Sequence, residues 1–311
     1  MSLLRFVPEC NQPSADMLKK FRDVLASINR FTVLTGAGIS TESGIPDYRS
    51  EKVGQYARSK HRPIDYQTFM KSERWRRRYW ARNAIAWPRF SRSEPNATHH
   101  AIASWEQSDK FNWLITQNVD GLHTKAGSRM LTELHGCGYR VRCMNCNTIF
   151  PRDEVQKWIM NANRSWYVTE VGEMAPDGDV PISENAIDSF TLPYCPHCGP
   201  GSILKTDVVF FGDCVPREDV DKCYEKLEES DALLVLGSSL MVMSGFRFVQ
   251  RAHFRRMPIL IVNIGPTRAD HLATVKSMQL EILRQIRTIR TADTGTASSS
   301  KYHRRFVIEV I

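Results

Sequence analysis

Four cysteines stand in two pairs whose spacing suits a metal ion. Cys143-x-x-Cys146 and Cys195-x-x-Cys198 can each present two thiolates from one tight turn, and two such pairs complete the tetrahedral Cys₄ set that zinc prefers. Four thiolates leave no open coordination position, so we expect a structural zinc, with a catalytic zinc or a redox dithiol as alternatives. A long insertion must loop out between the two pairs.

A second candidate site begins where an apolar segment ends in glycines. Residues 31–35 have the character of a buried strand, and Gly36, Ala37 and Gly38 follow directly. Glycines at such a point let the backbone approach a ligand closely, and a helix that begins after them points free N–H groups at a phosphate. The dinucleotide fingerprint of hydride-transfer enzymes has a third glycine where this chain has Thr41, so the motif alone is weak evidence.

Three further apolar segments end in polar or glycine-rich tips. They are 111–116 followed by Gln117, Asn118, Val119 and Asp120, 232–236 followed by Gly237, Ser238 and Ser239, and 258–262 followed by Asn263, Ile264 and Gly265. In open parallel sheets the ligand binds outside the carboxyl ends of the strands. Backbone N–H groups at the tips suit phosphates, and the Asn and Asp side chains suit ribose hydroxyls and a carboxamide. Four such tips together predict a dinucleotide site, with ordinary turn chemistry at each tip as the alternative.

His135 lies between the predicted dinucleotide strands and the cysteine-bearing region. An imidazole with a pKa near 6.5 can accept a proton at neutral pH, so His135 is a candidate general base. Taken alone, it could equally be a core histidine with satisfied hydrogen bonds. Cys137 beside it could suggest a thiol nucleophile, but no separate base and orienting group accompany it.

The elements that must hold these residues alternate between strand and helix. A helix capped by Ser14 or Asp16 precedes the strand at 31–35, and Asn96 can cap another that runs to Trp105. Residues 66–90 are expected to be helical, whereas 150–190 lack periodicity. The regular pattern returns at 208–213 and continues with a helix that has Val220, Tyr224 and Leu227 on one face. The strands at 232–236 and 258–262 follow. Met278 to Arg290 keep helical spacing before a linker and a basic tail. The alternation predicts an α/β fold with a parallel sheet covered on both faces.

The composition bounds what the chain can do. It has 311 residues, 42% hydrophobic and 24% charged, as is typical of a globular protein, and no apolar run approaches the ~20 residues of a membrane span. The net charge of +8 would suit an anionic cofactor or nucleic acid. Much of it lies at 74–78 and in the C-terminal tail, so we interpret it as solvated surface. Eight cysteines without a secretory signal favour metal ligands or free thiols over disulfides.

In this order, the motifs resemble those of the sirtuin family over roughly residues 14–276. The matching segments are 36–40, 46–49, 117–120, 135–136, the two cysteine pairs, 211–213, 237–239 and 263–265. Tyr48, the Gly-Ser-Ser tip at 237–239 and the segment 175–180 resemble the class II branch. The family associates the mitochondrial members of this branch with lipoamidase, deacylase and ADP-ribosyltransferase activities.

The resemblance implies a Rossmann-like parallel sheet with helices on both faces plus a small Cys₄ zinc-binding domain. Residues 1–136 and 205–276 would form the discontinuous NAD-binding domain, 137–204 the zinc-binding insert and 277–311 a basic tail that departs from the family. NAD⁺ would be consumed as a co-substrate, with one structural Zn²⁺, and acyl-lysine proteins would be the partners. No stable nucleic-acid partner and no membrane association are predicted. The family suggests the mitochondrial matrix, whereas the oligomeric state is left open.

In the implied reaction the acyl oxygen attacks the ribose carbon that bears nicotinamide, and His135 then acts as general base on a ribose hydroxyl. Asn118 is the second catalytic candidate. The residues expected to bind NAD⁺ are Gly36, Ala37, Gly38, Asp47, Tyr48, Arg49, Tyr56, Gln117, Asn118, Val119, Asp120, Gly237, Ser238, Ser239, Asn263, Ile264 and Gly265. Those expected to bind the substrate are Tyr79, Arg82, Phe211, Gly212, Met241 and Val242. The expected metal ligands are Cys143, Cys146, Cys195 and Cys198.

Tyr79 and Arg82 suggest which acyl group is accepted. At i,i+3 on a helix the two side chains share a face, and an arginine can pair with a carboxylate through two hydrogen bonds. Sirtuins that remove acidic acyl groups carry a Tyr-x-x-Arg pair in a similar place. We therefore expect acidic, branched, glutaryl-like acyl-lysines to be accepted, the alternative being that Arg82 belongs to a solvated face with Arg76 and Arg78.

Three competing functions remain open at this point. A mono-ADP-ribosyltransferase with weak deacylation would keep the fold and use only the first step. A zinc-ribbon nucleic-acid-binding protein would explain the cysteines and the charge, but not four ligand-like tips. A hydride-transfer dehydrogenase would explain the glycines, yet the chain lacks the third glycine and a clear acidic residue about 20 positions further on.

Overall fold

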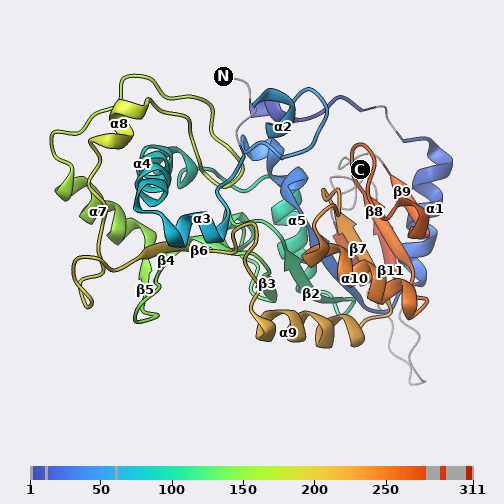
Figure 1. The fold of residues 1–311 in the computed structure, drawn as a ribbon. Coiled ribbons are helices and arrows are strands. Elements are labelled where there is room, and N and C mark those ends of the chain that lie inside the picture. The colour runs from blue at the N-terminus through green and yellow to red at the C-terminus, as the bar shows by residue number, and fades with distance from the viewer. Residues whose placement is uncertain (1–2, 11–12, 60–61, 278–287, 292–305, 310–311) are drawn as a thin grey trace.

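The computed structural model describes residues 3–10, 13–59, 62–277, 288–291 and 306–309. Its larger lobe is built on a six-stranded sheet in which every neighbouring pair is parallel (Figure 1). The spatial order is β3 (Leu131–Glu133), β2 (Phe111–Thr116), β1 (Phe31–Thr35), β7 (Ala232–Leu236), β8 (Ile259–Val262) and β9 (Val275–Ser277). From β1 the sheet continues through β2 to β3 on one side, and from β7 through β8 to β9 on the other side. The strand order therefore reverses between β1 and β7.

Both faces of this sheet are covered, as the continuous apolar strands predicted. Val33 points into one core with Phe21 of α1 (Ala15–Ser27) and Ile102 of α5 (Ala97–Trp105). The next residue, Leu34, points into the opposite core with Leu227 of α9 (Arg217–Glu228) and Phe248 of α10 (Met243–Phe254). The predicted α/β fold class is therefore confirmed.

The smaller lobe contains an antiparallel three-stranded sheet in the order β5 (Ile149–Pro151), β4 (Gly136–Cys143), β6 (Leu204–Val208). Three helices surround it: α4 (Glu73–Phe90), α7 (Arg152–Ala162) and α8 (Glu184–Asp188) (Figure 1). Trp80 of α4 is buried in this lobe, where its indole N–H donates to the Leu204 carbonyl at 2.8 Å.

Short elements complete the two lobes. They are η1 (Leu3–Phe6), η2 (Ala37–Ser43), α2 (Gln55–Arg58), α3 (Tyr66–Lys71), α6 (Leu122–Lys125) and η3 (Asp270–Leu272). Among the described residues, no helix combines the length and the apolar character needed to cross a membrane.

Three details differ from the sequence-based expectations. The helix predicted over 66–90 is two helices, because the chain leaves the helical conformation at Ser72, whose side chain caps α4. The region 150–190 contains α7 and α8 although its periodicity is weak. The segment 208–213 does not add a strand to the large sheet, since β6 ends at Val208 and pairs with β4 in the smaller lobe.

The C-terminal helix predicted from Met278 to Arg290 falls largely outside the described residues, at 278–287. At its end, Thr288–Thr291 is a strand, β10, so the helical prediction is wrong there. β10 pairs antiparallel with β11 (Phe306–Glu309), and residues 292–305 lie outside the described part of the chain.

The proposed domain limits lie close to the ends of the small sheet. β4 begins at Gly136 and β6 ends at Val208, so the paired strands reach slightly beyond the insert 137–204. Helix α4 precedes the insert in sequence, yet Trp80, Ala81 and Ala84 of this helix belong to its core. An amphipathic pattern shows that a helix has a buried face, but not which lobe buries it.

Asn96 links two elements of the large lobe and gives a test of the fold. Its side-chain oxygen accepts from the N–H groups of Thr98 and His99, while its amide donates to the Ile39 carbonyl at 2.7 Å and to the Ser43 hydroxyl at 3.1 Å. We predict that Asn96→Ala lowers the free energy of unfolding by about 1–3 kcal/mol, measured in urea.

Two further variants distinguish the capping of α5 by Asn96 from its hydrogen bonds to Ile39 and Ser43. Asn96→Asp keeps the accepting oxygen that caps α5 and loses both donated bonds, so the loss of stability in this variant reports the link to Ile39 and Ser43. Ser14→Ala removes an exposed cap with a single bond and should cost at most about 1 kcal/mol. Equal losses for Asn96→Ala and Ser14→Ala would contradict the linking role.

Candidate active site and metal centre

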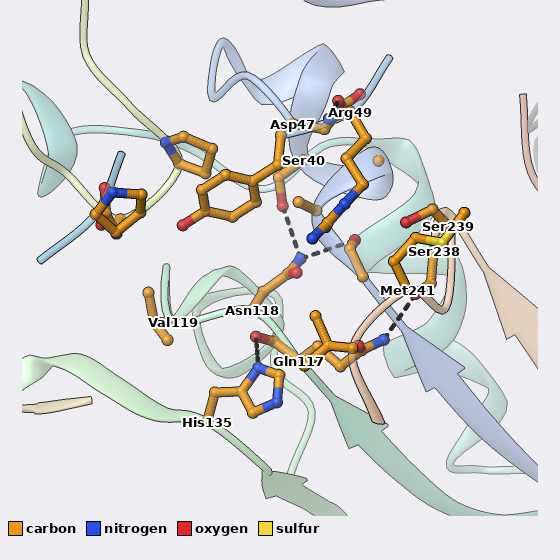
Figure 2. Close-up of a pocket in the computed structure, with 18 of the residues that line it drawn as sticks. Ser40, Asp47, Arg49, Gln117, Asn118, Val119, His135, Ser238, Ser239 and Met241 are labelled. Carbon is orange, nitrogen blue, oxygen red and sulfur yellow. Dashed lines mark hydrogen bonds between the residues drawn. The ribbon is translucent and has the colours of Figure 1, made fainter. Parts of the chain in front are cut away.

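One large cavity, of about 1600 Å³, lies at the carboxyl ends of the parallel strands and extends to the smaller lobe. The tips of β1, β2, β7 and β8 all reach it, as the alternating pattern predicted. Every predicted cofactor and substrate residue lines this cavity except Tyr56, and His135 lines it too. Figure 2 shows the Gln117 side chain reaching toward the tip that carries Ser238 and Ser239, and the Asn118 side chain pointing toward Ser40. The His135 ring lies against the Gln117 backbone.

The glycines let the tips of β1 and β7 pack backbone against backbone. The Gly38 N–H donates to the Gly237 carbonyl at 2.8 Å, and a Cβ at Gly38 would lie only 2.8 Å from that same oxygen. Gly237 has a φ of +57°, and a Cβ there would meet the Ile39 nitrogen at 2.5 Å. These glycines therefore bring two loops together, in addition to the close approach to a ligand that the sequence suggested.

The amide side chains after β2 join the tips. Gln117 donates to the Ser238 hydroxyl at 2.8 Å and to the Thr35 carbonyl at 3.1 Å. Asn118 donates to the Gly36 carbonyl and to the Ser40 hydroxyl, both at 3.1 Å (Figure 2). Both side chains are thus oriented by neighbouring strands before any ligand binds.

Asp120 is a buried carboxylate at the edge of this network. Burial raises the pKa of Asp120, while the bond that Ser40 donates to it at 2.7 Å opposes the rise. Its other oxygen accepts from the Leu122 N–H at the start of α6. Ser40 therefore holds both Asn118 and Asp120 in place, although its side chain was not among the predicted site residues.

His135 is held at both ring nitrogens. Nδ1 lies 2.9 Å from the Gln117 carbonyl, and Nε2 lies 2.7 Å from the Ser244 hydroxyl. Because a carbonyl can only accept, Nδ1 carries the proton and Nε2 has the lone pair. Burial lowers the pKa of His135, and the bond to Gln117 partly opposes this shift. The ring is therefore neutral at pH 7, as a general base must be.

The loop after Gly44 holds the next group of predicted residues. Asp47 accepts from the N–H groups of Arg49 and Ser50 at 2.8 and 2.7 Å. Tyr56 does not line the cavity; its ring packs against Tyr48 with centroids 5.5 Å apart, and the Arg49 guanidinium lies 5.5 Å from its centre. Tyr56 therefore supports two lining residues instead of facing the ligand.

Tyr79 and Arg82 share one face of α4, as their spacing predicted, and both line the cavity. Only 3% of the Arg82 side chain is exposed, so the alternative that placed it on a solvated face is wrong. Its Nε lies 2.9 Å from the Asp179 carboxylate and donates to the Val180 carbonyl at 2.7 Å. Burial lowers the pKa of Arg82, and Asp179 opposes this shift.

Two segments expected to hold a peptide border the same cavity. Phe211 and Met241 are 43% and 46% exposed, so both large apolar side chains are open to contact with a ligand. The backbone of Phe211 is fixed because its carbonyl accepts from the Tyr66 N–H at 2.9 Å. Gly212 next to it has a φ of +76°, with open space where a side chain would start.

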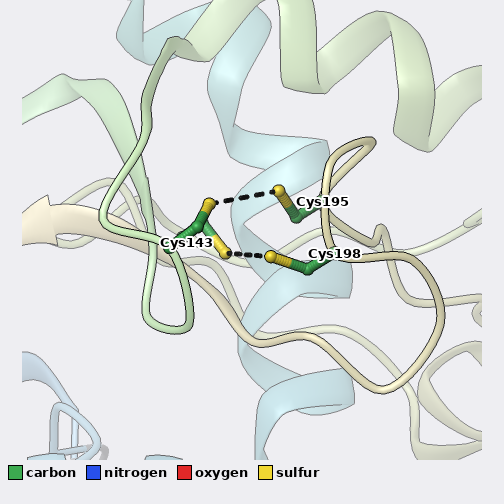
Figure 3. Close-up of side chains that lie close together, drawn as sticks. Cys143, Cys195 and Cys198 are labelled. Carbon is green, nitrogen blue, oxygen red and sulfur yellow. Dashed lines mark hydrogen bonds between the residues drawn. The ribbon is translucent and has the colours of Figure 1, made fainter.

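The four predicted metal ligands lie together in the smaller lobe. The sulfurs of Cys143, Cys146, Cys195 and Cys198 all lie within 4.8 Å of one another (Figure 3). The Cys143–Cys198 and Cys146–Cys195 sulfur pairs are 3.9 and 3.8 Å apart. A tetrahedron with Zn–S bonds of about 2.3 Å has S–S edges of about 3.8 Å, so the cluster fits zinc. With four thiolates and no open position, the ion would be structural.

Several lining residues were not predicted. Ser244 comes from the first turn of α10, more than one hundred positions after His135 in sequence, and no local pattern marks it. The N-terminal segment also lines the cavity, through Arg5 and residues 7–10. Ser40 could have been found, because it stands only two positions after Gly38.

A parallel sheet whose tips meet a Cys₄ lobe across one cavity is the architecture of NAD-dependent protein deacylases of the sirtuin class. The chain belongs to this class: the model of the Sir2 family matches residues 36–244. The resemblance seen in the sequence is thereby confirmed.

Individual relatives agree along most of the chain. An NAD-dependent protein deacylase, sir-2.2, of Caenorhabditis elegans is 52% identical over 274 residues, which cover 88% of this chain and 95% of that protein. The human mitochondrial NAD-dependent protein lipoamidase sirtuin-4 is 51% identical over 271 residues, covering 87% and 85%. A solved Sir2–p53 peptide–NAD⁺ complex has a TM-score of 0.67 at 26% identity, covering 86% of this chain and 96% of that one.

Replacing one thiolate tests the metal centre. We predict that Cys143→Ser reduces bound zinc from one ion per chain to near zero and leaves residues 137–204 open to protease digestion, because structural zinc contributes ~10–16 kcal/mol in small modules. Zinc analysis and limited proteolysis measure this. Cys214→Ser, which changes an exposed cysteine outside the cluster, is the matched control. Full zinc content in Cys143→Ser would contradict the assignment.

Proposed function

We propose that the chain transfers an acyl group from a protein lysine to the ADP-ribose part of NAD⁺, with release of nicotinamide, and that His135 is the general base of this reaction. The NAD-dependent deacylase activity follows from membership of the Sir2 family. The observation that supports the catalytic proposal is that four strand tips and the neutral, doubly hydrogen-bonded imidazole of His135 line one cavity. NAD⁺ is a substrate here and no hydride is transferred.

Each tip would contribute one part of the NAD⁺ site. We propose that the backbone around Gly36, Gly38 and Ser238 receives the pyrophosphate, since N–H groups at glycine tips suit phosphate oxygens. Gln117 and Asn118 would orient the ribose and nicotinamide, because both amides are already fixed by bonds to neighbouring tips. Asn263, at the end of β8, would reach the adenosine ribose.

His135 would remove a proton from a ribose hydroxyl at Nε2. The Gln117 carbonyl fixes the tautomer that leaves this nitrogen free of a proton, and it can accept a stronger bond from Nδ1–H once the ring becomes charged. Structural zinc, held by the four cysteines, would supply no chemistry and would keep the smaller lobe folded.

The substrate would be an acyl-lysine in an extended peptide. The exposed edges at Phe211–Gly212 and Met241–Val242 would hold it by main-chain hydrogen bonds, so we expect the preference for peptide sequence to be weak. Because the human relative is named a mitochondrial protein, we propose a location in the mitochondrial matrix. The absence of stable nucleic-acid and membrane partners remains a prediction.

Replacing the base tests the catalytic role. We predict that His135→Tyr lowers deacylation ~10²–10⁴-fold while the thermal unfolding profile stays close to that of the wild type. Formation of O-acyl-ADP-ribose and free lysine is measured by mass spectrometry. If ADP-ribose is instead transferred to protein, and this transfer survives the replacement, the ADP-ribosyltransferase alternative is favoured. Undiminished deacylation would exclude His135 as the base.

The pH dependence follows from the lowered pKa of His135. Its neutral form is the active one, so activity is complete above the pKa and is lost as the pH falls through it. We predict that kcat/KM loses activity on acidification with an apparent pKa below about 6.5, the ordinary histidine value. A midpoint at or above pH 7 would contradict the proposed base.

Arg82 gives a test of acyl preference. We propose that a glutaryl-like acyl carboxylate is recognised by Arg82 beside Asp179, which orients the guanidinium. Arg82→Met should lower the ratio of glutaryl-lysine to acetyl-lysine hydrolysis at least ~10-fold, since a charged hydrogen bond contributes about 1.5–3 kcal/mol. Arg74→Met removes an exposed arginine of the same helix that does not line the cavity, so it should leave the ratio unchanged. An unchanged ratio in Arg82→Met, in a variant that still folds, rejects the idea.

A further inference from the structure

The hydroxyl of Ser244 contacts the one nitrogen of His135 that the reaction needs. Ser244 Oγ lies 2.7 Å from Nε2, and both side chains line the cavity. Since Nδ1–H is engaged by the Gln117 carbonyl, Nε2 must accept, and the serine O–H must donate. The lone pair of the base is therefore occupied by a protein group when the cavity contains no ligand.

The first turn of α10 is built so that Ser244 can reach the imidazole. The next residue, Gly245, is buried, and a Cβ there would lie 2.5 Å from the Gln117 side-chain oxygen. Gln117 has little freedom to move away, because its amide donates to Thr35 and Ser238. A glycine at 245 thus lets α10 approach the tip of β2 closely, and this approach brings the Ser244 hydroxyl to Nε2.

We propose that Ser244 is a positioning residue for the general base, whose hydroxyl donates to His135 Nε2 until a ribose hydroxyl of NAD⁺ takes its place. Two hydrogen bonds at opposite ends of the ring fix its plane, whereas the Gln117 bond alone fixes only one end. One lone pair accepts one strong hydrogen bond, so the ribose hydroxyl must replace the serine before its proton moves to Nε2. This inference rests on the proposed base role of His135.

The bond also keeps the base neutral. A hydrogen bond to the lone pair favours the unprotonated imidazole, and it acts together with burial, which lowers the pKa of His135. The bond to the Gln117 carbonyl opposes this shift. Loss of the serine hydroxyl should therefore raise the pKa of His135 without changing any charge nearby.

The test compares Ser244→Ala with Ser244→Thr, which keeps a hydroxyl. For Ser244→Ala we expect acyl transfer in a single turnover to fall about 3–10-fold, and the acidic midpoint of kcat/KM to rise by about 0.5–1 pH unit. Nicotinamide exchange, which precedes the use of the base, should change less than twofold. Ser244→Thr should restore most of the rate and the midpoint. Ser104→Ala, on the exposed side of α5, is the control for a serine-to-alanine change.

A readout independent of turnover completes the test. Nitrogen-15 NMR of the ligand-free protein should show His135 protonated at Nδ1, with a pKa that is higher in Ser244→Ala than in the wild type. An unshifted pKa, equal behaviour of the Ala and Thr variants, or an equal fall in nicotinamide exchange would overturn the proposal. If His135→Tyr retains deacylation, the base role itself fails, and the two failures can be told apart.

Discussion

The site depends on one backbone contact, between the glycine tips of β1 and β7 at the point where the strand order reverses. The Gly38 N–H donates to the Gly237 carbonyl, and neither residue could carry a side chain without a clash. That contact places Ser238 where Gln117 can reach it, and the Gln117 carbonyl in turn fixes the tautomer of His135. A chain of short contacts therefore connects the sheet topology to the protonation of His135.

The second constraint is the separation of the two lobes. The parallel sheet provides the tips, but the far wall of the cavity includes Tyr79 and Arg82 of α4, a helix whose buried face belongs to the smaller lobe. This lobe has a small hydrophobic core, and the four clustered cysteines offer zinc as an additional cross-link. The metal centre and the part of the cavity lined by Tyr79 and Arg82 are thus connected through α4.

Local features were predictable from the sequence, and features that depend on distant contacts were not. The cysteine pairs and the four tips could be found because spacing within a few residues defines them. Ser244 could not be found, since its role depends on where α10 packs against β2. The sequence likewise predicted a helix over 66–90 but not its break at Ser72. It associated 208–213 with the regular α/β pattern of the large sheet, whereas β6, which ends at Val208, pairs with β4 in the smaller lobe. Tyr56 was among the residues expected to bind NAD⁺, yet it packs against Tyr48 and does not line the cavity.

The account depends on NAD⁺ being cleaved across the strand tips while an acyl group leaves lysine. Incubation of the protein with NAD⁺ and a panel of acyl-lysine peptides, followed by mass spectrometry of both products, measures this directly. We expect one nicotinamide and one O-acyl-ADP-ribose for each lysine released. Reduced cofactor, or nicotinamide formed without any loss of acyl groups from the peptides, would contradict it.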